Sequence, residues 1–381
     1  TPLAGRFDRN RPALWNAGEK PTVHTQETGR STPRANAEVA LGDPSSAGAG
    51  WERVENHWRE LAGEPWFVSD LYAALAKRFV RSVRIEDPDS FYRATDQGGV
   101  LYLANHQNLL ESLFFTTVMT ALTNNRIGTM IKIWIEEHWI GRLLTDAMRY
   151  PDFRPDAMFP YRLFFFNDAE PRSLFRLLEE MKGFLREGAS CMVHVEGTRA
   201  FSSRHRVTKI SDGVIRLAIE AGVAIVPVRF SGGLPENDVE EKPIYPYRLV
   251  AQDIHLGQAI PPEALAGLSM KERKQVVLNA INGTGPDPDD ERMSPVDFEF
   301  ERAVRDWTEA AGCVKESAVL YQALKAADDT RFGSDTRDLL AGRGAAAWPD
   351  TPKGRWMAQW AELLLGARGE RLLAREEAAN V

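Results

Sequence analysis

Short apolar runs alternate with longer amphipathic segments through the middle of the chain, and this alternation constrains the fold more than any other feature. A strand that is apolar throughout is typical of a parallel sheet covered on both faces by helices. We therefore expect an α/β domain with a mixed, largely parallel central sheet and helices on both faces. The expected strands are 100–104, 128–135, 161–166, 190–195 and 223–230, and the expected helices between them are 108–122, 136–148, 174–188 and 210–222.

The flanking segments predict two further parts. Residues 1–50 contain scattered Pro, Gly, Ser and Thr without sustained periodicity, so we expect a tail or linker there. The α/β domain is expected over 51–290, because the turn-rich stretch 282–290 marks a boundary. Beyond it, apolar residues recur at helical spacing, which predicts a helical C-terminal extension over 291–381.

Composition excludes several classes of protein. Of the 381 residues, 43% are hydrophobic and 27% are charged, as in ordinary soluble chains, and the net charge of −7 offers no general attraction to nucleic acid. No apolar run reaches the roughly 20 residues that span a bilayer. The two cysteines, Cys191 and Cys313, match no metal-ligand spacing. The histidines other than His106 are scattered along the chain, so we expect no metal and no cofactor. We expect a cytoplasmic location, either soluble or peripheral on the inner face of the membrane.

One polar group follows the first expected strand. The stretch "YLANHQNLLES" (102–112) places Asn105 and His106 after a strand, with Glu111 in the helix that follows. A carboxylate bonded to one imidazole nitrogen makes the other nitrogen a better base, so the pair is a candidate for activating a hydroxyl. The alternative is a surface histidine near a helix start, with Glu111 only stabilising the helix.

A basic loop follows the strand at 190–195. The stretch "VHVEGTRAFSSRHRVTK" (193–209) concentrates Arg199, Arg204, Arg206 and Lys209, and Gly197 allows close approach of the backbone, a combination that suits a phosphate or another anion. Glu196 is a candidate to pair with Arg199 and orient its guanidinium. The alternative is a solvated, arginine-rich loop.

Together these motifs resemble those of the glycerolipid acyltransferase family, the enzymes that acylate glycerol phosphate and lysophosphatidic acid. "NHQNLLE" is similar to the NHxxxxD motif with Glu111 replacing Asp, "VEGTR" is similar to the EGTR motif, and "EAGVAIVPVRF", around Pro227, is similar to the fourth motif. The second motif is degraded to "FFFNDAEPR". Lys132 lies where relatives carry a lysine, and the resemblance covers roughly residues 80 to 260.

The resemblance implies an O-acyltransferase that moves a fatty acyl group from acyl-CoA or acyl carrier protein to the hydroxyl of a lysophospholipid or glycerol-phosphate-type acceptor. It implies that His106 is the general base and that Glu111 orients it, with Asn105 and Pro227 in support. It also implies an acceptor or phosphate site drawn from Lys132, Glu196, Gly197, Thr198, Arg199, Arg204 and Lys209.

Other functions remain open at this point. An acceptor other than a glycerolipid, or water in a thioesterase, fits the degraded second motif and Glu111. The missing initiator Met and the linker-like start also fit a domain of a polyunsaturated fatty acid synthase, or a weakly active acyl- or lipid-binding module. Trp66 and Phe67 begin an amphipathic segment that is either a helix packed on the domain or a surface helix that rests on lipid and makes transient membrane contact.

Overall fold

The computed structural model describes residues 37–42, 49–62, 66–132, 161–167, 169–327 and 330–366. The expected helix 136–148 lies outside these residues. Eight strands form one sheet in the order β1-β2-β8-β7-β3-β6-β4-β5, and five of its seven neighbouring pairs are parallel. The strands are β1 Glu38–Leu41, β2 Val80–Ile85, β3 Leu101–Ala104, β4 Ile127–Lys132, β5 Tyr161–Phe166, β6 Ser190–His194, β7 Ile225–Ser231 and β8 Gln252–Leu256.

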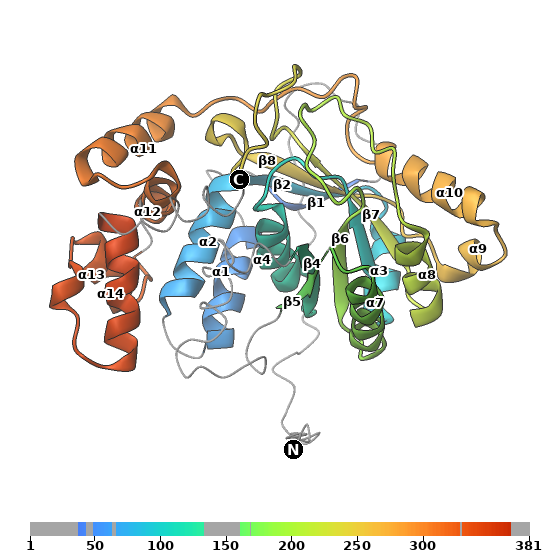
Figure 1. Cartoon of the computed structure of the whole chain (residues 1–381), viewed down its shortest axis with the longest axis horizontal. Helices are drawn as coiled ribbons and strands as arrows, with labels where there is room; N and C mark the ends of the chain where they lie inside the picture. Colours follow the sequence, from blue (N-terminus) through green and yellow to red (C-terminus); the bar gives the residue numbers. More distant parts are fainter. Residues whose placement is uncertain are drawn as a thin grey trace.

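Helices cover both faces of this sheet, so the predicted α/β class is confirmed (Figure 1). They are α1 Ala49–Ala62, α2 Phe67–Phe79, α3 Pro88–Asp96, α4 Glu111–Thr123, α7 Pro171–Arg186, α8 Asp212–Ala221, α9 Pro262–Ala266, α10 Met270–Asn282, α11 Phe298–Ala311, α12 Lys315–Ala327, α13 Ser334–Leu340 and α14 Pro352–Leu365. Within the described residues, no helix has the length and apolarity to cross a bilayer.

The central strand β3 shows why the sheet is buried on both sides. All four of its residues are buried, and alternate side chains enter different cores. Tyr102 and Ala104 belong to the core formed with α1, α2 and α4, whereas Leu101 and Leu103 belong to the core formed with α7, α8 and α10. An apolar run without alternation is therefore the pattern that this position requires.

The N-terminal segment differs from the predicted tail in one respect. Residues 38–41 form β1, which pairs antiparallel with β2 and closes that edge of the sheet. The expectation of a tail or linker over 1–50 is therefore wrong for this stretch. Four residues are too few for an alternating pattern to stand out, and the pairing with β2 is what makes them a strand.

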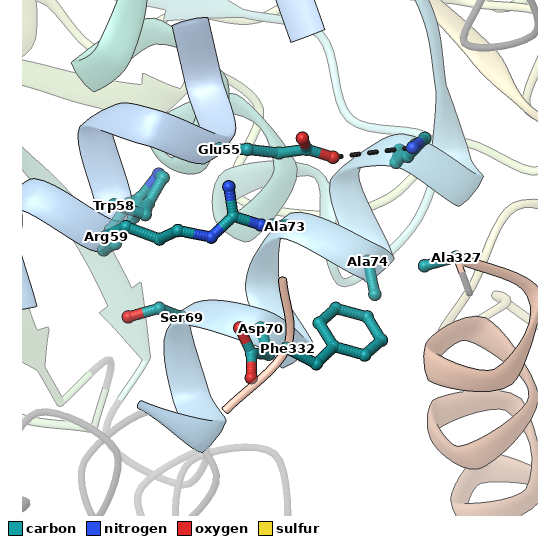
Figure 2. Close-up of a pocket in the computed structure, with 10 residues that line it drawn as sticks. Glu55, Trp58, Arg59, Ser69, Asp70, Ala73, Ala74, Ala327 and Phe332 are labelled. Atoms are coloured by element: carbon teal, nitrogen blue, oxygen red, sulfur yellow. Dashed lines mark hydrogen bonds and ion pairs between the residues drawn. The ribbon is translucent and has the colours of Figure 1, made fainter. Parts of the chain in front are cut away.

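The C-terminal helices pack against the N-terminal ones, as Figure 1 shows for α11 to α14 beside α1 and α2. Residues of α12 and α14 join the same core as α2. The buried carboxylate of Asp70 accepts hydrogen bonds from Thr336 Oγ1 at 2.5 Å and from the backbone N–H of Gly333 at 3.0 Å. Figure 2 shows Phe332 next to Asp70 and Ala74, at a cavity of only about 10 Å³. The boundary near residue 290 stays a prediction.

Trp66 and Phe67 do not form a lipid-facing surface. Trp66 is 7% exposed and Phe67 is 1% exposed, and the Phe67 ring lies 5.1 Å from the ring of Trp360 in α14. The C-terminal helices pack on the apolar face of α2, for which the sequence alone indicates no partner. This observation removes the reason for expecting a membrane anchor at that helix.

Candidate active site

The site lies at the carboxyl ends of three adjacent parallel strands, β4, β3 and β6, where the loops that follow them meet. Asn105 follows β3 directly, and its side-chain amide fixes the turn. Its Nδ2 donates to the carbonyl oxygen of Phe230 at 2.9 Å, and its Oδ1 accepts from the N–H of Phe230 at 2.7 Å. The turn before α4 is thereby attached to the neighbouring strand β7.

His106 and Glu111 face each other across this turn, as the motif predicted. The distance from Nδ1 of His106 to Oε2 of Glu111 is 2.9 Å. Glu111 is the first residue of α4, whereas His106 precedes the helix, so the two side chains converge despite being five residues apart. The His106 side chain is 14% exposed and that of Glu111 is 0% exposed. The alternative of a surface histidine is therefore wrong.

Three donors converge on the Glu111 carboxylate. Besides His106, the backbone N–H of Gln107 donates to Oε2 at 2.9 Å, and Nδ2 of Asn108 donates to Oε1 at 3.1 Å. Burial raises the pKa of the Glu111 carboxyl well above its usual range, and the hydrogen bonds from Gln107 and Asn108 oppose the rise. Donors on both oxygens favour the ionised form. An ionised Glu111 requires the proton on Nδ1 of His106, which leaves Nε2 as an acceptor.

Two cations, Arg199 and Lys242, lie beside this pair, and a third, Lys132, lies near Lys242. Arg199 and Lys242 are close enough to lower the pKa of His106, although burial is the larger cause of that shift. Burial and the charges of Arg199 and Lys132 lower the pKa of Lys242 in turn. Like charges gathered in a partly buried place repel each other unless an anion joins them, so this group suits a phosphate.

The loop after β6 and the segment around Lys242 fix this group. Nη1 of Arg199 donates to the carbonyl oxygens of Lys242 and Pro243 at 2.8 and 2.7 Å. Nζ of Lys242 donates to Oγ1 of Thr198 at 2.5 Å and lies 4.7 Å from the centroid of the half-exposed Phe201 ring. Thr198 thus reaches the cation group through Lys242.

The other predicted members of the loop are placed differently. Glu196 does not pair with Arg199: its carboxylate accepts from Nε2 of His205 at 3.1 Å and from the N–H of Thr208 at 3.1 Å, because the loop folds back on itself. Gly197 has a φ of +65°, which favours glycine. Arg204 and Lys209 are exposed and make no hydrogen bond or ion pair with the described part of the chain.

Pro227 lies within β7, opposite Leu103 of β3. It lines a groove of about 370 Å³ between the segment that follows β8 and helix α10, together with residues such as Ile260 and Val276. Its supporting role stays a prediction.

A comparison with protein families covers the part of the chain that carries His106, Glu111 and Arg199. Residues 82–231 match the model of the family described as Acyltransferase. This stretch therefore resembles an acyltransferase domain. Among solved structures, the 1-acyl-sn-glycerophosphate (LPA) acyltransferase PlsC from Thermotoga maritima is similar, with 16% identity and a TM-score of 0.38 over 61% of this chain and 78% of that chain. No curated protein sequence matches the chain.

The matched range includes His106, Glu111 and Arg199, while their roles as family motifs stay a prediction. Two residues at the site lie outside it. Lys242 is in an acidic run, "DVEEKP", that carries no motif, so no local signal singles it out. Glu291 comes from the turn-rich stretch before α11 and reaches the matched range only through the fold.

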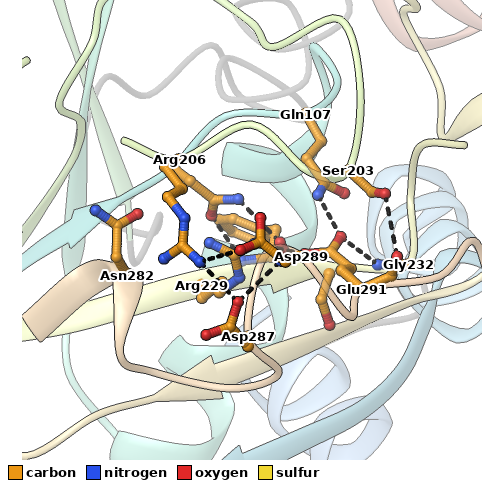
Figure 3. A network of polar contacts seen from close by, with 12 residues as sticks. Gln107, Ser203, Arg206, Arg229, Gly232, Asn282, Asp287, Asp289 and Glu291 are labelled. Carbon is orange, nitrogen blue, oxygen red and sulfur yellow. Dashed lines mark hydrogen bonds and ion pairs between the residues drawn. The ribbon is translucent and has the colours of Figure 1, made fainter. Parts of the chain in front are cut away.

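Glu291 anchors a buried polar network beneath the site, which Figure 3 shows. Its Oε1 accepts from Nε2 of Gln107 at 2.7 Å, and its Oε2 pairs with Nη2 of Arg229 at 2.6 Å. The backbone N–H of Gly232 also donates to it at 3.1 Å. Burial raises the pKa of Glu291, and the charge of Arg229 opposes the rise. The network ties the turn that carries His106 to β7.

One further cluster of donor atoms coincides with the site. His106, Glu111 and His194 place one potential metal-ligand atom each within 4.8 Å of one another, which makes them a possible metal group among the described residues. Their side chains already bond to protein groups: His106 to Glu111, and His194 to Asn105 and Ser112. These bonds account for the cluster without an ion, and the expectation of no cofactor stays a prediction.

Proposed function

We propose that the chain transfers a fatty acyl group from a thioester, acyl-CoA or acyl carrier protein, to the hydroxyl of a lysophospholipid or glycerol-phosphate-type acceptor. The observation that carries this proposal is the placement of Arg199 and Lys242 beside a buried histidine–carboxylate pair, with Lys132 near Lys242, in a stretch that matches the acyltransferase family. The pair suits removal of a proton from a hydroxyl, and the cations suit a phosphate on the same acceptor.

In the proposed reaction, Nε2 of His106 takes the proton of the acceptor hydroxyl while Nδ1–H stays bonded to Glu111. The acceptor oxygen then attacks the thioester carbonyl carbon and forms the new C–O bond. The tetrahedral intermediate collapses as the C–S bond breaks, and the leaving sulfur receives the proton from His106. No covalent acyl-enzyme is needed, and His106 ends the cycle neutral.

The carboxylate stabilises the charge that develops on His106 during this step. Glu111 cannot turn away, because Gln107 and Asn108 hold both of its oxygens. A base held in one tautomer and one orientation contributes about 10² to 10⁴-fold to such a transfer.

The cation group supports the choice of a phosphate-bearing acceptor. Lys132, Arg199 and Lys242 come from three separate segments that meet at the edge of the sheet: the end of β4, the loop after β6 and the segment before η2, Tyr247–Leu249. Only Nη1 of Arg199 bonds to carbonyl oxygens of the described chain, which leaves its other donors for a ligand. The ammonium groups of lysines and the planar guanidinium of an arginine both bind phosphate oxygens well.

The test is a thiol-release assay with acyl-CoA or acyl carrier protein as donor and with lysophosphatidic acid or glycerol 3-phosphate as acceptor. We expect release that depends on the acceptor, together with formation of the acylated product. Release at the same rate without any acceptor would indicate a thioesterase instead. Absence of release with every donor and acceptor would contradict the proposal.

A further inference from the structure

His194, the last residue of β6, lies flat against the His106 ring. The two ring centroids are 3.7 Å apart and the ring planes differ by 18°. The position is two residues before Glu196 in the "VHVEGTR" stretch, and the proton transfer described above does not use it. One face of the histidine proposed as base is therefore covered by a second histidine.

Both nitrogens of the His194 ring are bonded. Nδ1 lies 2.6 Å from the carbonyl oxygen of Asn105, and Nε2 lies 3.1 Å from Oγ of Ser112. A carbonyl oxygen can only accept, so Nδ1 must carry the hydrogen. In the neutral ring Nε2 then accepts from the Ser112 hydroxyl. This assignment fixes the tautomer of His194.

The two partners of His194 flank the proposed catalytic pair in the sequence. Asn105 immediately precedes His106, and Ser112 immediately follows Glu111. The ring therefore joins the turn before α4 to the first turn of α4 itself. Any rotation of the helix start relative to the turn would separate His106 from Glu111, and it would also break one of these two bonds.

We propose that His194 is a positioning residue, which covers one face of the His106 ring and holds together the two segments that carry the base and its carboxylate. This inference rests on the proposed function, because it assigns His194 to the same reaction. His194 touches no substrate in this role; it acts through His106.

The charge of His194 is compatible with that role. Burial lowers the pKa of His194 to about 4, so the ring is neutral at neutral pH. The interaction with His194 also lowers the pKa of His106, after burial, which is the largest cause. The charged or titratable groups that face His106 are Glu111 from α4, His194 from β6, Arg199 from the loop after β6 and Lys242 from the segment before η2.

Three variants distinguish the two proposed roles of His194, which are to cover the His106 ring and to hold the two segments together. His194→Ala removes both the ring and its hydrogen bonds, His194→Phe keeps a flat ring without them, and Ser112→Ala removes one hydrogen bond and leaves the ring. Each variant is measured for kcat, for the acceptor KM and for the pKa of His106, which is followed by an NMR titration of its ring protons. Circular dichroism checks that each variant is folded.

For His194→Ala we expect kcat to fall about 10- to 100-fold, as a base displaced by about 1 Å does, with the acceptor KM unchanged. Water then reaches the exposed face of His106, so the pKa of His106 should rise toward about 6.5. His194→Phe should keep the low pKa of His106 and lose less of kcat. Ser112→Ala should lower kcat only a few-fold and leave the pKa in place.

An unchanged kcat with an unchanged pKa of His106 in His194→Ala overturns the inference, and so does a change confined to the acceptor KM. If His194→Ala does not fold, His194→Phe and Ser112→Ala test the same point: wild-type kcat in both would reject it. The NMR titration needs no turnover. A wild-type chain that transfers no acyl group would therefore reject the proposed function alone, while the response of His106 would still test its dependence on His194.

Discussion

Gln107 and Glu291 are 184 residues apart in the sequence, and their side chains form a 2.7 Å hydrogen bond beneath the proposed active site. Gln107 also donates its backbone N–H to Glu111, so one residue connects two buried carboxylates. The segment before α11 is thereby part of the support for the histidine–carboxylate pair. This relationship leads to the first of five predictions.

Glu291→Ala should destabilise the protein by about 3–5 kcal/mol, because it leaves the fully buried Arg229 without its charged partner. The measurement is urea unfolding at pH 7. The matched control is Glu236→Ala, which removes a partly exposed partner of Arg292 at 3.6 Å and should cost less than about 1 kcal/mol. Equal effects of the two variants would show that the buried pair is not a stabilising support.

His106→Ala should lower kcat by about 10² to 10⁴-fold without unfolding the protein, since it removes the proposed base. Glu111→Gln keeps the size of the side chain but removes its charge, so it should also lower kcat. Steady-state acyl transfer at saturating substrate measures both effects. Wild-type turnover in folded His106→Ala would reject the assignment of the base.

The pH dependence of acyl transfer should report an apparent pKa that belongs to the histidine–carboxylate pair rather than to either residue alone. Burial lowers the pKa of His106, with smaller contributions from the neighbouring positive charges, so the neutral base should persist below its usual value of about 6.5. We expect kcat/KM to fall on acidification with a midpoint below about 6.5. Glu111→Gln should move that midpoint further toward acid, because a lost negative charge disfavours the imidazolium. A wild-type midpoint above 6.5 would contradict this expectation.

Arg199→Ala and Lys242→Ala should each raise the acceptor KM about 10- to 100-fold, as expected for the loss of a charge-assisted contact of about 1.5–3 kcal/mol. The effect on the acyl-donor KM should be small, and added salt should weaken acceptor binding in the wild type. The control is Lys271→Ala, which removes an exposed charge on α10. Helix α10 packs on the face of the sheet opposite to α4. An unchanged acceptor KM in both Arg199→Ala and Lys242→Ala would count against the phosphate site.

Buried histidines also predict how stability depends on pH. Burial lowers the pKa of His255 to about 4, whereas in the unfolded chain it is about 6.5. Between these values the unfolded state binds a proton that the folded state does not, so acid favours unfolding. The free energy of unfolding should therefore fall by about 3 kcal/mol from this residue as the pH drops from 6.5 to 4. Urea titrations across that range test the slope, which His255→Gln should reduce.

Much of this architecture could be predicted from local patterns. The strands around 101–104, 190–194 and 225–231 and the helices between them follow from continuous apolar runs and from periodicity, because burial on both faces leaves no room for polar residues. Strand β2 is not among the strands expected from the sequence, because Val80 follows α2 directly and no turn signal separates the helix from the strand. Strand β1 is too short to produce a pattern.

The sequence by itself determined the α/β class, the turn that carries His106 and Glu111, and the resemblance of their motifs to those of an acyltransferase family. These features depend on residues that are close together in the sequence, so the spacing of residue types along the chain is enough to predict them. The tertiary structure alone decided that Lys242 joins Arg199, that Glu291 supports Gln107 and that His194 stacks on His106. It also decided that Trp66 and Phe67 are buried, with Phe67 packed against Trp360 of α14. Each of these contacts joins segments far apart in the sequence, and the packing of the sheet and helices brings them together.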